Sequence, residues 1–164
     1  MTTNPQFQID VTRPEEAEAI LAISRSVGVF DAEEIATVDE LLREYIGQGA
    51  RKSGYHFLSY RNGEHVLGFA CYGPRALTCG TFDLYWIATA KEAQGRGIGG
   101  ALLQRVAQEV KALGGRLIVA ETSSRPDYAP TRRFYETHAF DRAATIADFY
   151  APGDDMVVYV QRLG

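Results

Sequence analysis

The residues best suited to chemistry form a glycine-rich segment in the middle of the chain. Residues 94–100, with the sequence QGRGIGG, contain four glycines and run directly into a helical pattern. Glycine lets the backbone approach a ligand closely and direct several N–H groups at one point. The start of a helix adds unpaired N–H donors and a partial positive charge. Together these features predict a phosphate or pyrophosphate site. The alternative is a tight loop that needs glycine only for its turn.

Regular elements on both sides must position this loop. Residues 81–89 are rich in aromatic and β-branched side chains, which is typical of a buried strand. The helix after the loop should bury one apolar face and end at Gly114-Gly115, and that face consists of Leu102, Leu103, Val106, Val110 and Leu113. Residues 117–122 then predict a second strand, so the segment reads as strand, loop, helix and strand.

The preceding part of the chain predicts a strand, two helices and a hairpin. Residues 6–11 alternate apolar and polar side chains, as a strand does. A capping box in residues 12–15 starts the first helix, which Gly28 ends, and Asp31 with Glu34 starts the second. The acidic residues of these first turns are expected to act as caps and dipole partners. Asn62-Gly63, between strand-like residues 55–60 and 66–72, predicts a tight turn.

The last part of the chain predicts a helix and a strand pair. Asp127 can cap a helix over residues 128–138, in which Pro130 is tolerated in the first turn. Residues 140–150 and 156–163 are expected to be strands on either side of a turn. Repeats, low-complexity tracts and linkers are not evident. The sequence therefore predicts one α/β domain over residues 1–164, α+β by some schemes, with a mixed sheet.

Composition narrows the classes of partner. The chain has 164 residues, a common size for one domain, and a formal net charge of -4. This acidic balance predicts no nucleic-acid partner, and without an apolar span or a signal pattern we expect no membrane partner and a cytoplasmic location. Cys71 and Cys79 lack metal-site spacing and do not cluster in sequence with the histidines. We expect two buried or half-buried thiols and no metal.

The glycine spacing also matches a dinucleotide-binding fingerprint. Gly95, Gly97 and Gly100 satisfy G-x-G-x-x-G, and Glu121 ends the next strand where the ribose-binding acid would be. In that fold, however, the glycines follow the strand at once, whereas here residues 90–94 intervene, and few residues remain after Glu121. A nicotinamide or flavin oxidoreductase is therefore a minor alternative. A Walker-type loop is excluded because neither Lys-Ser nor Lys-Thr follows the glycines.

A third interpretation explains the position of the loop. Residues 94–99, QGRGIG, lie several residues beyond a strand and open a long helix; they resemble the Q/R-x-x-G-x-G/A motif of the GNAT superfamily of N-acetyltransferases. Residues 134–140, FYETHAF, are similar to the Y-x-x-x-G-F segment of the same family, with Ala139 in place of its glycine. The resemblance covers most of the chain. It implies a mixed, mostly antiparallel central sheet with flanking helices and a splayed parallel strand pair at the CoA site.

The resemblance implies that acetyl-CoA is the co-substrate. The family binds its pyrophosphate through backbone amides of the glycine loop, which here are Gln94, Gly95, Arg96, Gly97, Ile98, Gly99 and Gly100. The pantetheine arm pairs with the end of the motif strand, at Ile87, Ala88 and Thr89. A backbone N–H near Ile87 would polarise the thioester carbonyl. Tyr128 stands where several members have a CoA-contacting asparagine, so the resemblance does not carry that contact over to this chain.

The resemblance also implies catalytic residues for direct transfer to a primary amine in a ternary complex. Tyr135 takes the position of the family's general acid, although it could instead be a packed core aromatic. For the base, Glu121 comes first, Asp83 second, and a water relay third. Asp83 shares a strand face with Tyr85 and Ile87. Either carboxylate could instead bind the ammonium group or form a structural ion pair.

The acceptor is the least defined part of the prediction. A small molecule or a peptide amine is expected, and transfer to a protein N-terminus or lysine is less well supported. A non-catalytic acyl-CoA-binding or regulatory domain is the main rival, against which Tyr135 and the candidate carboxylates count. The chain could also form a homodimer. Neither the acceptor's identity nor an acyl preference beyond acetyl follows from the sequence.

Overall fold

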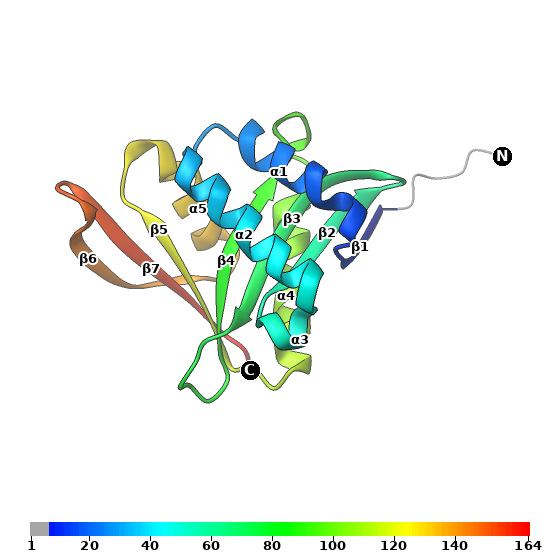
Figure 1. The fold of residues 1–164 in the computed structure, drawn as a ribbon. Coiled ribbons are helices and arrows are strands. Elements are labelled where there is room, and N and C mark those ends of the chain that lie inside the picture. The colour runs from blue at the N-terminus through cyan, green and yellow to red at the C-terminus, as the bar shows by residue number, and fades with distance from the viewer. Residues whose placement is uncertain (1–6) are drawn as a thin grey trace. The chain divides into compact units, whose positions relative to one another are not determined.

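The computed structural model describes residues 7–164 and contains seven strands, five α-helices and three short 3₁₀ helices. The 3₁₀ helices are Pro14–Glu16, Lys91–Ala93 and Pro126–Tyr128. In chain order, the α-helices and strands (Figure 1) are β1 (Phe7–Val11), α1 (Ala17–Ser26), α2 (Ala32–Gln48), α3 (Ala50–Ser53), β2 (His56–Asn62), β3 (His65–Pro74), β4 (Thr81–Thr89), α4 (Ile98–Ala112), β5 (Leu117–Ser123), α5 (Ala129–Thr137), β6 (Asp141–Ala151) and β7 (Asp154–Arg162).

The strands form one mixed sheet in the order β1-β2-β3-β4-β5-β7-β6. The pairs β1–β2, β2–β3, β5–β7 and β6–β7 are antiparallel, whereas β4 and β5 are parallel. The parallel register runs from Thr81 opposite Leu117 to Leu84 opposite Ala120, and β4 continues beyond it to Thr89. The predicted mixed, mostly antiparallel sheet with flanking helices and one parallel pair is confirmed.

The chain forms two compact units, and β4 and α4 each contribute to both. The first unit contains the chain up to Gly73 together with Trp86–Val106, and the second contains Pro74–Tyr85 and Ala107–Gly164. The predicted glycine loop therefore belongs to the first unit. The three predicted catalytic side chains belong to the second unit.

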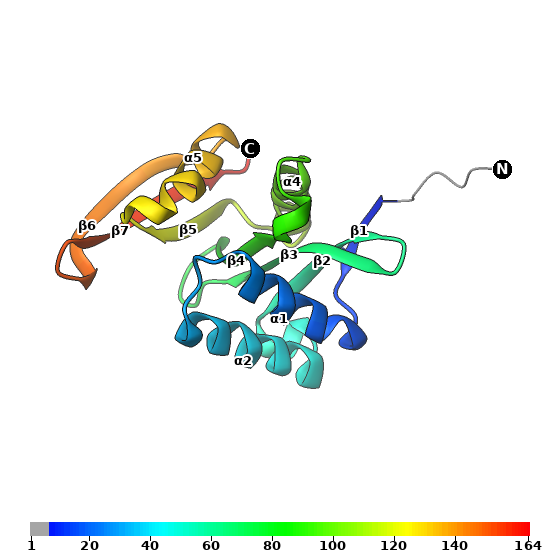
Figure 2. The same ribbon diagram turned by 90° about the horizontal axis from the view of Figure 1, so that it is seen from above.

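In the first unit, helices cover both faces of β2 and β3. Figure 2 shows α1 and α2 on one face and α4 on the other. On the first face, the rings of Tyr45 in α2 and Phe57 in β2 lie 5.3 Å apart. On the second, Leu102 and Val106 of α4 are fully buried. These apolar contacts are the expected result of amphipathic helices packing on a buried sheet.

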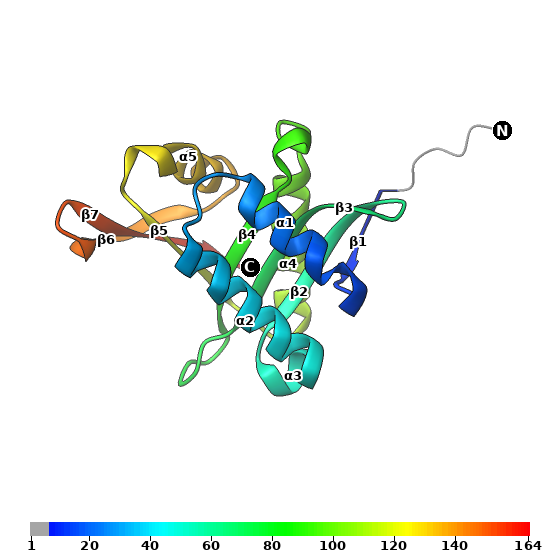
Figure 3. The same cartoon turned by 45° about the horizontal axis from the view of Figure 1, so that its top comes forward.

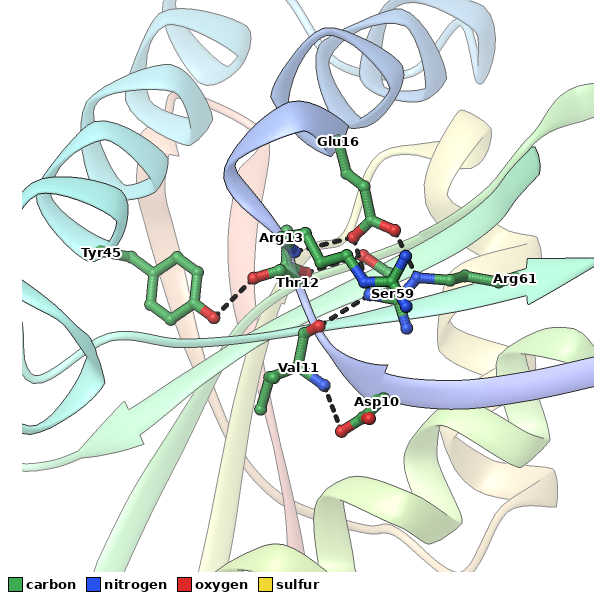
Figure 4. A network of polar contacts seen from close by, with 8 residues as sticks. All are labelled: Asp10, Val11, Thr12, Arg13, Glu16, Tyr45, Ser59 and Arg61. Carbon is green, nitrogen blue, oxygen red and sulfur yellow. Dashed lines mark hydrogen bonds and ion pairs between the residues drawn. The ribbon is translucent and has the colours of Figure 1, made fainter. Parts of the chain in front are cut away.

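A buried ion pair ties the start of the first helical segment to β2. Glu16 accepts hydrogen bonds from Nε and Nη2 of Arg61, and their side chains are only 9% and 3% exposed (Figure 4). Arg61 Nη2 also donates to the Val11 carbonyl at 2.7 Å, and the backbone N–H of Arg13 donates to Glu16 at 2.8 Å. Burial raises the pKa of Glu16, but the hydrogen bonds from Arg61, Arg13 and Ser59 and the charge of Arg61 outweigh it, so that the pKa lies below its ordinary value of 4.5.

In the second unit, α5 packs on one face of β5 and β7, and β6 completes a long hairpin with β7 (Figure 3). Tyr135 of α5 lies 5.5 Å from Tyr159 of β7 and 5.3 Å from Phe140, measured between ring centroids. Every residue of β6 is exposed. The core of this unit therefore lies under α5 and not under the hairpin's outer strand.

Several local predictions were wrong in detail. The N-cap of the first helical segment is Arg13, whose backbone N–H donates to Glu16 at 2.8 Å, and the predicted box of Thr12 and Glu15 is not formed. The Thr12 hydroxyl is instead bonded to the buried Ser59 hydroxyl at 2.7 Å. Asp127 does not cap α5, whose N-cap is Tyr128. Leu113 is 54% exposed because α4 ends at Ala112.

Two further predictions need correction. The tight turn between β2 and β3 consists of Gly63 and Glu64, while Asn62 still pairs with His65. Gly63 has a φ of +61°, so the positive φ expected of the turn glycine is confirmed. Cys71 is buried as predicted, but Cys79 is exposed.

Candidate functional site

The loop between β4 and α4 is anchored by backbone and side-chain hydrogen bonds (Figure 1, green loop at the top). The Ala90 N–H donates to the Leu67 carbonyl of β3 at 2.8 Å, and the 3₁₀ helix Lys91–Ala93 follows. The Gln94 side chain turns back and donates to the Thr89 carbonyl at 3.3 Å. The five residues between strand and glycines thus form a defined turn that leads into α4.

Two glycines of the loop adopt a backbone conformation that other residues avoid. Gly95 and Gly97 both have a φ of +79°, and a Cβ atom built on either would meet nothing within 4 Å. The conformation, not crowding, therefore requires glycine there. The Gly97 carbonyl accepts from the Ala101 N–H at 3.1 Å, so the N–H groups of Ile98, Gly99 and Gly100 form the first turn, where intrahelical acceptors are lacking.

The first turn of α4 thus has the donor chemistry of an anion site. Its backbone N–H groups and the helix dipole favour negative charge. Arg96 is exposed and donates from Nη2 to the Glu92 carbonyl at 3.2 Å, which leaves it at the outside of the loop. Ile98 is buried and fixes the turn to the core. The residues present fit a pyrophosphate group bound by backbone N–H groups.

Gly68 in β3 supports this loop and was not predicted. A Cβ atom there would lie 3.0 Å from Ile98 Cγ2, 3.1 Å from the Ala88 carbonyl and 3.2 Å from a Leu102 methyl. Glycine therefore allows the first turn of α4 to pack closely on β3. The end of β4 lies in the same unit as the glycine loop. There Ala88 is buried, and Ile87 and Thr89 are partly exposed.

The two predicted carboxylates meet at an arginine. Nε and Nη2 of Arg75, just beyond β3, donate to both Asp83 oxygens over 2.8–3.0 Å. The same Nη2 donates to Glu121 at 3.2 Å. The Asp83 side chain is 11% exposed, whereas those of Arg75 and Glu121 are 47% and 38% exposed. Hydrogen bonds from Arg75 to Asp83 and the charge of Asp83 raise the pKa of the guanidinium, which stays cationic.

This arrangement separates the roles open to the two carboxylates. Asp83 is buried with both oxygens engaged, so it acts as an anchor for Arg75. Glu121 is exposed and accepts a single hydrogen bond from Arg75, which leaves acceptor capacity for a ligand. Both carboxylates therefore form the structural ion pair considered above, with Arg75 as the partner. Asp83 accepts three of the hydrogen bonds from Arg75, and Glu121 accepts one. Arg75 was missed in the sequence because nothing in a loop residue's spacing shows where its side chain points.

Tyr135 lies on the other face of the sheet from the carboxylates. Tyr159, against which Tyr135 packs, is opposite Ala120 in the β5–β7 register, and opposite residues share a face. Glu121 follows Ala120 and therefore points to the other face. Tyr135 is 5% exposed, and burial raises the pKa of its hydroxyl above the ordinary value of 10.0. The hydroxyl therefore keeps its proton at neutral pH.

In residues 7–164, no three or more His, Cys, Asp or Glu side chains are grouped to hold a metal ion. Nor does this part of the chain contain a helix long and apolar enough to cross a membrane.

Known proteins resemble this chain in sequence and in fold. The sequence pattern of the acetyltransferase (GNAT) family matches residues 21–140. No curated protein matches the chain. A crystal structure assigned to the GNAT family of acetyltransferases, from Desulfovibrio desulfuricans, is 42% identical over 97% of this chain and 99% of its own, with a TM-score of 0.91.

More distant structures share the fold. The ribosomal-protein-S18-alanine N-acetyltransferase from Escherichia coli has a TM-score of 0.77 at 18% identity over 97% of this chain and 95% of its own. A Salmonella typhimurium structure that contains acetyl-CoA has a TM-score of 0.78 at 20% identity over 98% and 95%. The matched family pattern and the 42% identical structure decide the assignment: this chain is an acyl-CoA-dependent acetyltransferase and belongs to the GNAT family.

Proposed function

We propose that the protein transfers an acetyl group from acetyl-CoA to a primary amine by direct attack in a ternary complex. The observation that carries this proposal is the loop before α4, where Gly95 and Gly97 hold a φ of +79° and lead into a helix start with free N–H donors. In this proposal, residues 94–100 bind the pyrophosphate, and the backbone of Ile87, Ala88 and Thr89 pairs with the pantetheine arm. Acetyl-CoA supplies the activated acetyl group as a thioester.

Glu121 is the proposed base. An amine must lose a proton to form a stable amide, and Glu121 combines exposure with spare acceptor capacity. Asp83 is the weaker candidate, because it is buried and its two oxygens are bonded to Arg75. A water molecule that relays the proton to Glu121 is consistent with the same geometry.

Tyr135 is the proposed acid. The amine nitrogen forms a bond with the acetyl carbon, the carbon–sulfur bond breaks, and the Tyr135 hydroxyl donates a proton to the leaving thiolate. The amine proton passes to Glu121, and solvent restores Tyr135. In this proposal Tyr135 acts on the leaving sulfur and Glu121 acts on the attacking amine, and the two side chains lie on opposite faces of the sheet. The raised pKa of Tyr135 keeps the proton available until the thiolate forms.

The test is an assay of free CoA thiol release with a panel of primary amines. Wild-type protein should release thiol only in the presence of an effective amine. Replacing Tyr135 by Phe or Glu121 by Gln should lower kcat by about 10²-fold or more, the scale of general acid–base catalysis. A matched control is Tyr60→Phe, an aromatic residue of β2 that has no part in the proposed chemistry.

The outcomes separate the roles. Unchanged turnover and pH profile in the Tyr135→Phe variant would exclude this residue as the acid. Tight binding of a nicotinamide dinucleotide without affinity for CoA would instead favour the oxidoreductase interpretation. The cytoplasmic location, the single domain over residues 1–164 and the homodimer stay predictions.

A further inference from the structure

Arg75 has hydrogen-bonding capacity that its two carboxylate partners do not use. Nε and Nη2 carry all four of its hydrogen bonds to Asp83 and Glu121. Within residues 7–164, nothing accepts a hydrogen bond from Nη1. A guanidinium has five donors in a rigid fork that matches carboxylates. The side chain is 47% exposed, so its unused donors are accessible to a ligand.

Asp83 holds Arg75 in one orientation. It is buried, and its two oxygens accept from the Nε and Nη2 edge of the guanidinium. The connection between β3 and β4, which carries Arg75, is also held by its backbone, because the Arg75 N–H donates to the Thr81 carbonyl at 2.9 Å. The guanidinium is therefore preorganised, which lowers the entropic cost of binding a ligand through Nη1.

Glu121 lies directly beside the Arg75 guanidinium. Its Oε1 is 3.2 Å from Arg75 Nη2, and its side chain is 38% exposed. The Arg75, Asp83 and Glu121 cluster has a net charge of -1, which favours an ammonium group at Glu121. A cation and an anion site thus adjoin each other on one sheet face. An α-amino acid has a matching pair of groups, because a single carbon atom separates its amine from its carboxylate.

The geometry points to a free amino acid as the acceptor, with its carboxylate bound by Arg75 and its amine bound by Glu121. This inference rests on the proposed function, since it names the acceptor class of the same site. Arg75 is a specificity-determining residue in this scheme and takes no part in proton transfer. A peptide N-terminus or a simple amine offers no carboxylate next to the amine, so it cannot use Nη1 in this way.

The experiment compares matched acceptors that differ only in the carboxylate. Alanine is paired with ethylamine and with alanine amide, and CoA thiol release gives kcat and KM for each. In the wild type we expect kcat/KM for alanine, or for the best of a panel of amino acids, to exceed that for its decarboxylated partner by about tenfold or more. This is the scale expected for a hydrogen bond between charged groups.

The variant Arg75→Lys tests the residue itself. Lysine keeps a positive charge beside Asp83 but lacks the planar fork. We expect the ratio of KM for the amino acid to KM for the amine to rise about tenfold or more relative to wild type. Arg125→Lys is the control, because Arg125 is also about half exposed, at 46%, and paired with Asp127. Tm is measured for both variants, and binding of the amino acid to CoA-loaded protein is measured by calorimetry.

Each outcome decides between specific claims. If Arg75→Lys raises KM equally for both members of a pair, Arg75 is only structural and the inference is overturned. If the wild type acetylates amines without preferring the carboxylate, the inference fails while the proposed function stands. If CoA binds but no amine of either kind is acetylated, the proposed function fails. The wild-type comparison decides the matter even if the variant does not fold.

Discussion

Replacing Arg61 by Met should destabilise the protein strongly, because it leaves the Glu16 carboxylate buried without its partner. The change removes three hydrogen bonds, two to Glu16 and one to the Val11 carbonyl. Methionine is apolar and of similar length, so packing is largely kept. The Arg13 N–H remains bonded to Glu16 and compensates only in part.

The structure places the expected magnitude at the lower end of the usual range. Breaking a buried ion pair by removing one partner costs about 3–5 kcal/mol. A cavity of about 260 Å³ borders Arg61 and Glu16, which gives water some access to the orphaned carboxylate. We therefore expect a loss of about 3 kcal/mol of unfolding free energy, equivalent to a fall in Tm of about 6–12 °C for a chain of this size.

A double variant separates the ion pair from the shape of the side chains. Glu16→Leu combined with Arg61→Met leaves no uncompensated charge, and it removes Arg61 Nη1, which is buried without a partner within residues 7–164. Its stability should recover to within about 1 kcal/mol of wild type, the residual cost being the lost cap on the Arg13 N–H. Urea unfolding at pH 7 measures all three proteins.

Acidification supplies an independent check. The pKa of Glu16 is lowered in the folded wild type, so its contribution to stability is present above the unfolded pKa and is lost as pH falls through the folded pKa. In Arg61→Met the buried carboxyl has no cation, its pKa rises, and protonation relieves the penalty. The stability gap should therefore narrow as pH falls from 7 towards 4. A gap below 1 kcal/mol at pH 7, or one that widens on acidification, would refute the reasoning.

Three further predictions follow from backbone conformation and exposure. Gly97→Ala should weaken CoA binding, measured by calorimetry, about tenfold, or 1.4 kcal/mol. The control is Gly28→Ala, where glycine has the same φ of +79° and open surroundings; this change should lower only Tm. Equal CoA affinities of the two variants would contradict the assignment of the glycine loop as the CoA site. Ala139 has a φ of +63° after α5, so Ala139→Gly should raise the unfolding free energy by about 1 kcal/mol in urea, and a loss would show that the strain is absent. A thiol reagent should label Cys79 in the folded protein but not Cys71, whose pKa burial raises, and two reactive thiols before unfolding would contradict this.

The strand, the glycine loop and the helix over residues 81–112 were predictable because their signals are local. The apolar strand Thr81–Thr89 and the helix after the glycines are set by residue types within a few positions of each other, and both appear as expected. Glycine at positions 95 and 97 permits the positive φ found there, although the residue type alone does not require it.

The carboxylate cluster depends on distant residues and was not predictable. Arg75 meets Asp83 eight residues away and Glu121 in another strand, through a loop conformation and a parallel register that periodicity does not encode. The first helix cap moved for the same kind of reason. The Thr12 hydroxyl could have capped the helix, but it is hydrogen-bonded to the buried Ser59 hydroxyl of β2. Tertiary partners therefore decided which of several competent side chains took each role.

The outer strand β6 has a consequence for behaviour at high concentration. It ends the strand order, and its eleven residues are all exposed, including Ile146, Phe149 and Tyr150. Such an edge can template strand addition by other molecules. Asp148 interrupts it, with a φ of +54° within an irregular stretch of the pairing with β7. The charge and the kink at Asp148 are therefore expected to oppose aggregation through this edge at high concentration.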